Sequence, residues 1–225
     1  MTLQISYLIL ETDRPVREEP GMLRGYFADR FPQYTLLHQH VGNAVIYSYP
    51  RVQYKIIGGT CSILGIDDGA RLIGEISPQI SSLTLLGKTY PVVRRILTGQ
   101  EGEITAVRRN FQYQFLLPWL ALNKENYERY HSLEREKDRK EMLNRILIGN
   151  ILSMAKGLGI VIDRQIFVHS RLEPAPAKYK GIRMVGFTGE FRTNVMIPDF
   201  FGIGKGVSEG FGTVKAVAGT NRSGY

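Results

Sequence analysis

The first hundred residues alternate between β-rich runs and helical segments in a definite order. Residues 3–11 form a β-rich run, and residues 20–31 carry apolar side chains at helical spacing between two prolines. Three short β-rich runs follow, Asp67-Asp68 then opens a short helix, and strands flank Gly87. The strands expected after the first helix are residues 45–49, 52–57, 61–66, 83–86 and 88–97. Strand, helix, strands, helix, strand is the order of a ferredoxin-like domain.

The second half of the chain repeats this mixture of strands and helix. We place a domain boundary at the turn predicted for Gly99-Gln-Glu-Gly102, which gives domains at residues 1–100 and 101–225. A charged segment leads into a long helix whose apolar stripe runs from Leu143 to Leu158. Strands are expected at residues 104–109 and 114–120, broken by Pro118, and at residues 160–171, 182–197 and 213–217. Both halves therefore belong to the α+β class.

A glycine-rich segment, Gly202–Gly212, lies before the last of these strands. Glycine tolerates positive φ and leaves backbone N–H groups uncovered, so such a loop can lie directly against a phosphate backbone. The order of its residues excludes a Walker A loop and the dinucleotide-binding fingerprint. A turn that binds nothing is the alternative. The candidate RNA-contacting residues in it are Gly202, Gly204, Lys205, Gly206, Gly210 and Gly212.

Composition favours a polyanionic partner. The chain has 29 Lys and Arg against 21 Asp and Glu, which gives a net charge of +8 and a pI near 9.6. The single cysteine, Cys61, forms no internal disulfide and is expected to be buried in a reducing compartment. The N-terminus lacks the pattern of a signal peptide, and no apolar run reaches the length of a membrane span. We expect a cytoplasmic protein without membrane contact.

Two histidines separated by one residue are the candidate catalytic groups. In an extended segment His38 and His40 would share a face about 6.6 Å apart, close enough to bracket one phosphodiester. A histidine with an ordinary pKa can accept or donate a proton at neutral pH. Tyr47 offers a hydroxyl to the reacting phosphate, and Arg51 and Lys55 supply cations for backbone phosphates or for developing charge.

Two other interpretations of the histidine pair stay open. His-x-His forms half of many zinc sites, but a catalytic zinc needs a third protein ligand. Cysteine is absent nearby, and His131 and His169 fall on elements expected to be distant, so we predict that no metal is bound. Alternatively, one or both histidines pack as structural residues.

Taken together, these motifs resemble the CRISPR repeat-cleaving endoribonucleases, Cas family six of the RAMP superfamily. The resemblance rests on the Leu-His motif before Tyr-Ser-Tyr-Pro-Arg-x-Gln-Tyr-Lys and on the terminal glycine loop. It extends over nearly the whole chain, from Leu23-Arg-Gly25 through the segment at residues 149–157. The paired histidines and Asn150-Ile-Leu-Ser-Met are most similar to the b subfamily.

The resemblance implies two tandem ferredoxin-like (RRM-like) domains with antiparallel sheets. It also implies metal-independent cleavage of CRISPR repeat RNA in precursor transcripts, leaving a 2′,3′-cyclic phosphate and a 5′-hydroxyl, without any cofactor. The catalytic histidine of the family matches His38 or His40, with Tyr47 as its helper. Many relatives have a lysine near the position of Asn43, so Arg30, Arg51 or Lys55 would fill that cationic role here.

Three further questions of function stay open at this point. A non-catalytic RNA-binding RAMP subunit of a CRISPR ribonucleoprotein is the alternative function, and the paired histidines argue against it. An unrelated basic enzyme or DNA-binding protein is less favoured, because no helix-turn-helix or zinc-finger signature is present. A homodimer and complexes with other CRISPR-associated proteins are compatible with the sequence.

Overall fold

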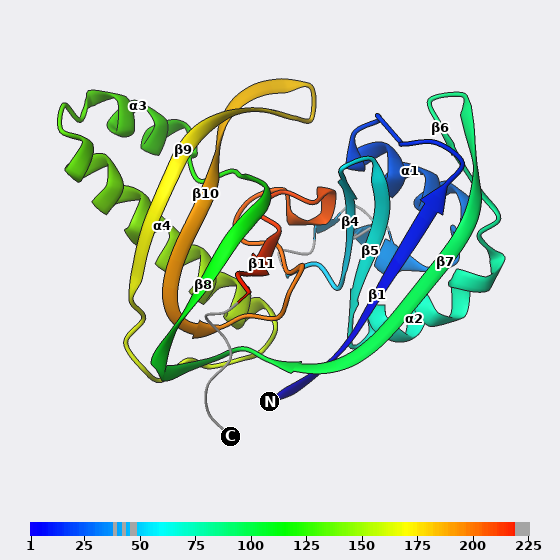
Figure 1. Cartoon of the computed structure of the whole chain (residues 1–225), viewed down its shortest axis with the longest axis horizontal. Coiled ribbons are helices and arrows are strands. Elements are labelled where there is room, and N and C mark those ends of the chain that lie inside the picture. Colours follow the sequence, from blue (N-terminus) through cyan, green and yellow to red (C-terminus); the bar gives the residue numbers. More distant parts are fainter. Residues whose placement is uncertain (38–39, 42–43, 46–48, 219–225) are drawn as a thin grey trace. The chain divides into compact units, whose positions relative to one another are not determined.

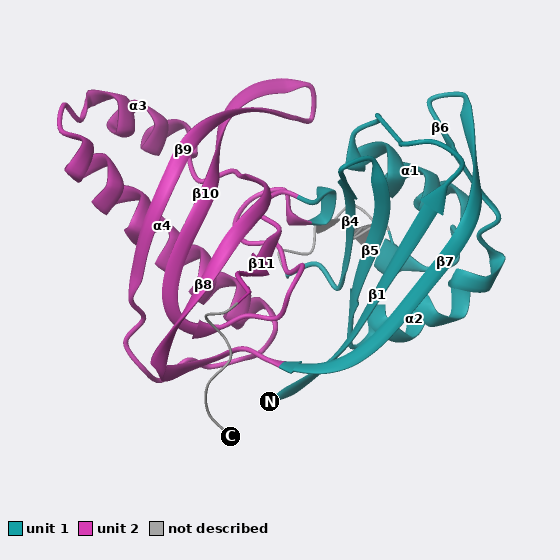
Figure 2. Cartoon of the chain, in the orientation of Figure 1, with its two compact units in different colours: residues 1–102, 208–210 teal, residues 103–207, 211–225 magenta. Residues whose placement is uncertain are grey.

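The chain folds into two compact units (Figures 1 and 2). A computed structural model describes residues 1–37, 40–41, 44–45 and 49–218. Unit 1 contains residues 1–102 together with residues 208–210, and unit 2 contains residues 103–207 and 211–225. Within the described residues, no helix is both long enough and apolar enough to cross a membrane.

Unit 1 has the ferredoxin-like arrangement. Its sheet has the strand order β4-β5-β1-β7-β6, in which β5 lies between β4 and β1, and β1 lies between β5 and β7. Without the edge strand β6, this is the antiparallel βαββαβ order expected from the sequence. The elements are β1 (Thr2–Thr12), α1 (Pro20–Arg30), β4 (Val52–Ile57), β5 (Thr60–Ile66), α2 (Asp68–Ile76), β6 (Ser82–Leu85) and β7 (Lys88–Glu103), with 3-10 turns at Thr35–Leu37 and Ser77–Gln79.

The core of unit 1 lies between its sheet and its two helices. The pairing of Leu8 with Ile63, and of Ile63 with Tyr54, places these three side chains on one face of the sheet. Phe27 of α1 packs on that face, with its ring centroid 5.6 Å from that of Tyr54. Cys61 lies in the same cluster and is buried, as predicted. Period-two patterning in the strands and helical patterning in α1 and α2 therefore meet in one apolar layer.

Unit 2 has the same topology as unit 1, except that a loop takes the place of the second helix. Its sheet order is β11-β8-β10-β9, and the helix α4 crosses between β8 and β9. Between β10 and β11 the chain makes a 3-10 turn at Val207–Glu209 within the glycine-rich loop, where a ferredoxin-like domain would place its second helix. The elements are β8 (Thr105–Trp119), α3 (Lys124–Ser132), α4 (Glu136–Gly157), β9 (Val168–Tyr179), β10 (Ile182–Met196) and β11 (Val214–Ala216).

Aromatic side chains form the core of unit 2. The rings of Phe115 and Trp119 stack with centroids 5.7 Å apart, and Phe191 lies 5.1 Å from Phe115. Leu147 and Ile151 of α4 are fully buried, as the apolar stripe of that helix predicts. Stacked rings contribute beyond the area that they bury, so this cluster fixes the sheet and the crossover helix together.

Three predictions about the strands were wrong. Gly99–Gly102 is no turn, because β7 continues through it as a single 16-residue strand. Pro118 does not break β8, since it falls where the pairing with β10 shifts register between Phe187 and Gly189 and no ladder donor is needed.

The strand expected at residues 160–171 instead begins at Val168 and runs to Tyr179. It contains Pro174 and Pro176. β9 is the edge strand of its sheet, where a residue without an N–H donor is tolerated on the open side.

Candidate functional site

The histidine motif lies on a short β-hairpin in unit 1. Its strands are β2 (His40–Val41) and β3 (Ala44–Val45), and His40 pairs with Val45. The backbone at His40 is therefore extended, which is the conformation that the proposed histidine pairing requires. His38 and Tyr47 lie outside the described residues, as does the side chain of His40.

Buried residues anchor the hairpin on both sides. Before it, the 3-10 turn at Thr35–Leu37 buries Leu37 in the core, and the Leu37 N–H donates to the Tyr34 carbonyl at 3.1 Å. After it, Tyr49 is buried and β4 begins at Val52. The core of unit 1 therefore fixes the chain a few residues before and a few residues after His40.

The three candidate cations of unit 1 differ in how accessible they are. Arg30 is exposed, and it donates to the Gln79 carbonyl at 2.9 Å. Arg51 is half-buried and forms an ion pair with Asp67 at the start of α2. Lys55 is 0% exposed, and its Nζ donates to Gln53 Oε1 at 3.1 Å. Lys55 is therefore not placed to contact a backbone phosphate, although the sequence suggested that role.

We expect Lys55→Met to flatten the dependence of stability on pH. Burial lowers the pKa of Lys55 to about 7, below its ordinary value. Between about pH 7 and pH 10 the Lys55 amine is therefore protonated in the unfolded chain and neutral in the folded chain. Because the unfolded chain binds more protons, the free energy of unfolding rises with pH across that window. Urea unfolding of the wild type should show this rise, and Lys55→Met should lose it. The exposed Lys124→Met is the control, and an equal pH slope in wild type and Lys55→Met would contradict the assignment.

The glycine-rich loop of unit 2 is mostly buried rather than open. Gly202 pairs with Thr213, and the Ile203 N–H donates to the Gly212 carbonyl at 3.0 Å. Lys205 is the exposed residue of the loop, with its Nζ 5.5 Å from the ring centroid of Tyr179. Lys205 is thus presented to solvent, whereas most of the surrounding backbone is covered.

Internal packing explains why this loop needs glycine. Gly204, Gly206, Gly210 and Gly212 all have positive φ, which costs glycine little. A Cβ on Gly204 would lie 2.7 Å from both Asn150 Oδ1 and Trp119 Nε1. These two atoms are themselves hydrogen-bonded at 3.1 Å. The segment at residues 149–157 and the glycine loop, read from the sequence as separate motifs, therefore meet at Asn150.

The tip of the loop belongs to unit 1 and contacts a third sequence motif. Arg24, from Leu23-Arg-Gly25, forms an ion pair with Glu209 at 3.4 Å, and both side chains are largely covered. A Cβ on Gly21 would lie 3.2 Å from Glu209 Oε2, which places α1 close against this residue. Spacing alone gave no sign of this contact, because the two residues lie 185 positions apart.

Solved structures share this architecture over the whole chain. A crystal structure of Cas6b is 37% identical, with a TM-score of 0.90, over 96% of this chain and 100% of that one. A crystal structure of the CRISPR RNA processing endoribonuclease Cas6b is 35% identical, with a TM-score of 0.77, over the same shares. The chain therefore has the two-domain α+β fold of a Cas6 protein.

Sequence models of the Cas6b N-terminal domain and the Cas6b C-terminal domain match residues 1–103 and 105–217. The chain belongs to the Cas6b family, which confirms the family inferred from the motifs. An uncharacterized protein of Methanocaldococcus jannaschii is 41% identical over 143 residues, which are 63% of this chain and 97% of that protein.

Proposed function

We propose that this protein is a metal-independent endoribonuclease that cuts CRISPR repeat RNA within precursor transcripts. The observation that carries the proposal is the match along nearly the whole chain to Cas6b, including a crystal structure named as a CRISPR RNA processing endoribonuclease. The extended backbone at His40 and the net charge of +8 are consistent with chemistry on a polyanion.

RNA supplies its own nucleophile for this reaction. The 2′-oxygen attacks the adjacent phosphorus, the bond to the 5′-oxygen breaks, and a 2′,3′-cyclic phosphate remains. A neutral histidine takes the proton from the 2′-hydroxyl, while a protonated histidine or Tyr47 gives a proton to the leaving 5′-oxygen. We assign these roles to His38, His40 and Tyr47, with base and acid exchangeable between the two histidines.

The described surface offers cations for the RNA backbone. Arg30 and Lys205 are exposed, and we propose that they contact phosphates. The glycine loop then acts through the shape that its packing on Trp119 and Asn150 maintains, and it presents Lys205 at its surface. A non-catalytic RNA-binding subunit would use these contacts without the histidines, so cleavage itself separates the two functions.

A cleavage assay in chelator tests the mechanism. We expect repeat RNA to be cut at an undiminished rate in EDTA, because the proposed reaction needs only the 2′-hydroxyl of the RNA and two proton transfers by side chains. Repeat RNA with a 2′-deoxy nucleotide just upstream of the cut should bind and stay intact. Activity that is lost in EDTA and restored by zinc or magnesium, or cleavage of the deoxy substrate, would contradict the mechanism. Binding without any cleavage would favour the non-catalytic subunit.

A further inference from the structure

Arg51 is a candidate cation of unit 1 that is fixed at both its backbone and its side chain. It directly precedes β4, the strand into which the chain runs from the proposed catalytic hairpin. Its carbonyl oxygen accepts a hydrogen bond from the Ile66 N–H at 2.9 Å. A Cβ on Gly69 would lie 2.1 Å from the same oxygen, so the start of α2 packs directly against the Arg51 backbone. The side chain is held as well, because its Nη1 forms the ion pair with Asp67.

Asp67, which holds this guanidinium, has a backbone conformation that is rare for residues other than glycine. Its φ is 51° and its ψ is -111°. Hydrogen bonds to Gln4 maintain this conformation: the Asp67 N–H donates to the Gln4 carbonyl at 2.7 Å, and the Gln4 N–H donates to Asp67 Oδ1 at 3.0 Å. The other carboxylate oxygen, Oδ2, faces Arg51. Backbone strain of this kind is costly and clusters at binding and catalytic sites, so Asp67 is a candidate for a functional role.

The ion pair leaves part of the Arg51 guanidinium available. The side chains of Arg51 and Asp67 are 29% and 30% exposed. Within the part of the chain that the structure describes, the guanidinium has no hydrogen-bond acceptor besides Asp67, so its Nε–H and Nη2–H groups remain for a ligand. A guanidinium presents its donors in a planar fork that matches two oxygens of one phosphate. The carboxylate of Asp67 therefore sets the direction in which that fork points.

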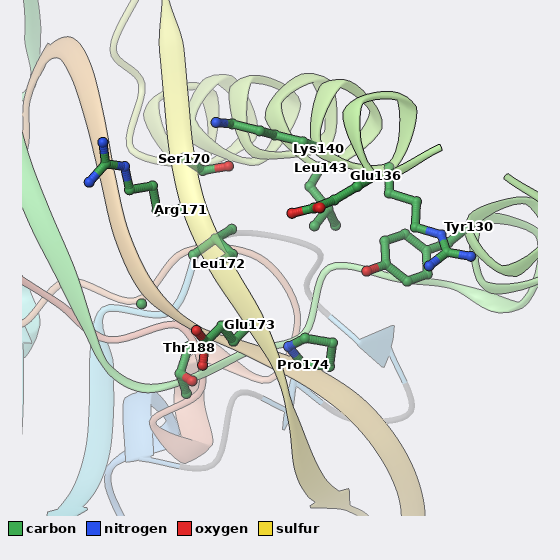
Figure 3. Close-up of a pocket in the computed structure, with 12 residues that line it drawn as sticks. Tyr130, Glu136, Lys140, Leu143, Ser170, Arg171, Leu172, Glu173, Pro174 and Thr188 are labelled. Carbon is green, nitrogen blue, oxygen red and sulfur yellow. The ribbon is translucent and has the colours of Figure 1, made fainter. Parts of the chain in front are cut away.

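The charged side chains around the pocket of unit 2 do not converge in this way. That pocket has a volume of about 640 Å³ and lies between α3, α4 and β9. In Figure 3, Glu136 and Tyr130 lie on the side of β9 that faces α4, and Arg171 and Glu173 lie on its other side. Groups on opposite sides of one strand cannot hold one phosphate together, whereas the free donors of Arg51 belong to a single oriented group.

We propose that Arg51 binds the phosphate that is cut and that Asp67 is the positioning residue for this contact, an inference that rests on the endoribonuclease function proposed above. Attack by the 2′-oxygen places additional negative charge on the oxygens of that phosphate, and a guanidinium aimed at them stabilises the transition state. Because the pair of Arg51 and Asp67 has no net charge, it adds little long-range attraction for RNA. Its effect therefore lies in the rate of cleavage more than in the affinity.

Single substitutions of the pair test this proposal with the full-length protein and repeat RNA. Arg51→Gln should slow single-turnover cleavage by about 10²–10³-fold, the loss expected when one donor to developing charge is removed. Asp67→Asn should slow it by about tenfold, because the guanidinium is no longer aimed. Asparagine tolerates positive φ and keeps an oxygen for the Gln4 N–H, so the fold is retained. The same variant should bind repeat RNA equally or slightly more tightly, since a negative charge is lost.

The double variant Arg51→Gln/Asp67→Asn tests whether Asp67 acts through Arg51. If it does, adding Asp67→Asn to the Arg51→Gln protein should change the rate by less than about twofold. Asp68→Asn is the matched control, because it removes the same charge one residue away, where the carboxylate pairs with the exposed Arg71. This control should cut at the wild-type rate.

A wild-type rate for Arg51→Gln would overturn the proposal, as would a further tenfold loss, or about that, when Asp67→Asn is added to Arg51→Gln. Far-UV circular dichroism checks that each variant is folded. Arg51→Lys keeps the charge without the planar fork, so it replaces Arg51→Gln where that variant does not fold, and an unchanged rate would again contradict the proposal. A wild type that binds repeat RNA without cutting it would refute the proposed enzyme itself, whereas a cutting wild type with an equally active Arg51→Gln would refute only the role of Arg51.

Discussion

His38→Ala and His40→Ala should each slow the cleavage of repeat RNA by about 10²–10⁴-fold, because each removes one proton-transfer group. Affinity for the RNA should stay within a few-fold, since a neutral imidazole adds little attraction for phosphate. Single-turnover cleavage and anisotropy on the same RNA measure the two effects separately. Loss of affinity without loss of the single-turnover rate would make these histidines binding residues instead.

Another histidine of the chain is a matched control for that experiment. His131 on α3 is an exposed residue of unit 2 and lies outside the proposed catalytic hairpin. His131→Ala should cut at the wild-type rate. A His38→Ala/His40→Ala double variant that still cuts normally would show that the active site lies elsewhere.

Local patterns in the sequence were enough to predict most elements of the fold. The stripe from Leu143 to Leu158 predicted α4 because helical spacing is a property of neighbouring residues. Pro118 was wrongly predicted to break a strand, because whether a strand tolerates proline depends on its place in the sheet. Whether a residue lies on an edge strand or at a bulge depends on strands that are distant in the sequence. A short stretch of sequence around the proline therefore does not reveal it.

The same distinction applies to the candidate site. The family could be inferred from short motifs, but their contacts could not be, because Arg24 meets Glu209 and Gly204 meets Asn150 across long separations. Lys55 resembled a surface cation in the sequence, yet it is fully buried in a strand that otherwise follows the predicted bounds. Burial is a tertiary property, and one charged residue in a β-rich run gives no sign of it.

Gly212→Ala should be among the most destabilising single substitutions in unit 2. The residue has a φ of +65°, and a Cβ would lie 2.0 Å from the Ile203 carbonyl oxygen. That oxygen cannot simply move away, because the Ile203 N–H donates to the Gly212 carbonyl at 3.0 Å and the Gly212 N–H donates to the Pro118 carbonyl at 2.9 Å. Strain at positive φ and the forced displacement together should cost about 3 kcal/mol or more.

Gly181→Ala separates these two contributions. Gly181 has a φ of +79°, but a Cβ there would meet nothing within 4 Å, so only the strain of positive φ remains, about 1–2 kcal/mol. The single tryptophan, Trp119, is buried in unit 2, so its fluorescence during urea unfolding reports on that unit for both variants. Equal shifts of the midpoint would mean that close packing is not what requires glycine at 212. A larger shift for Gly212→Ala, with normal RNA affinity in the folded fraction, would establish that the glycines shape the loop and that the RNA contacts come from exposed side chains such as Lys205.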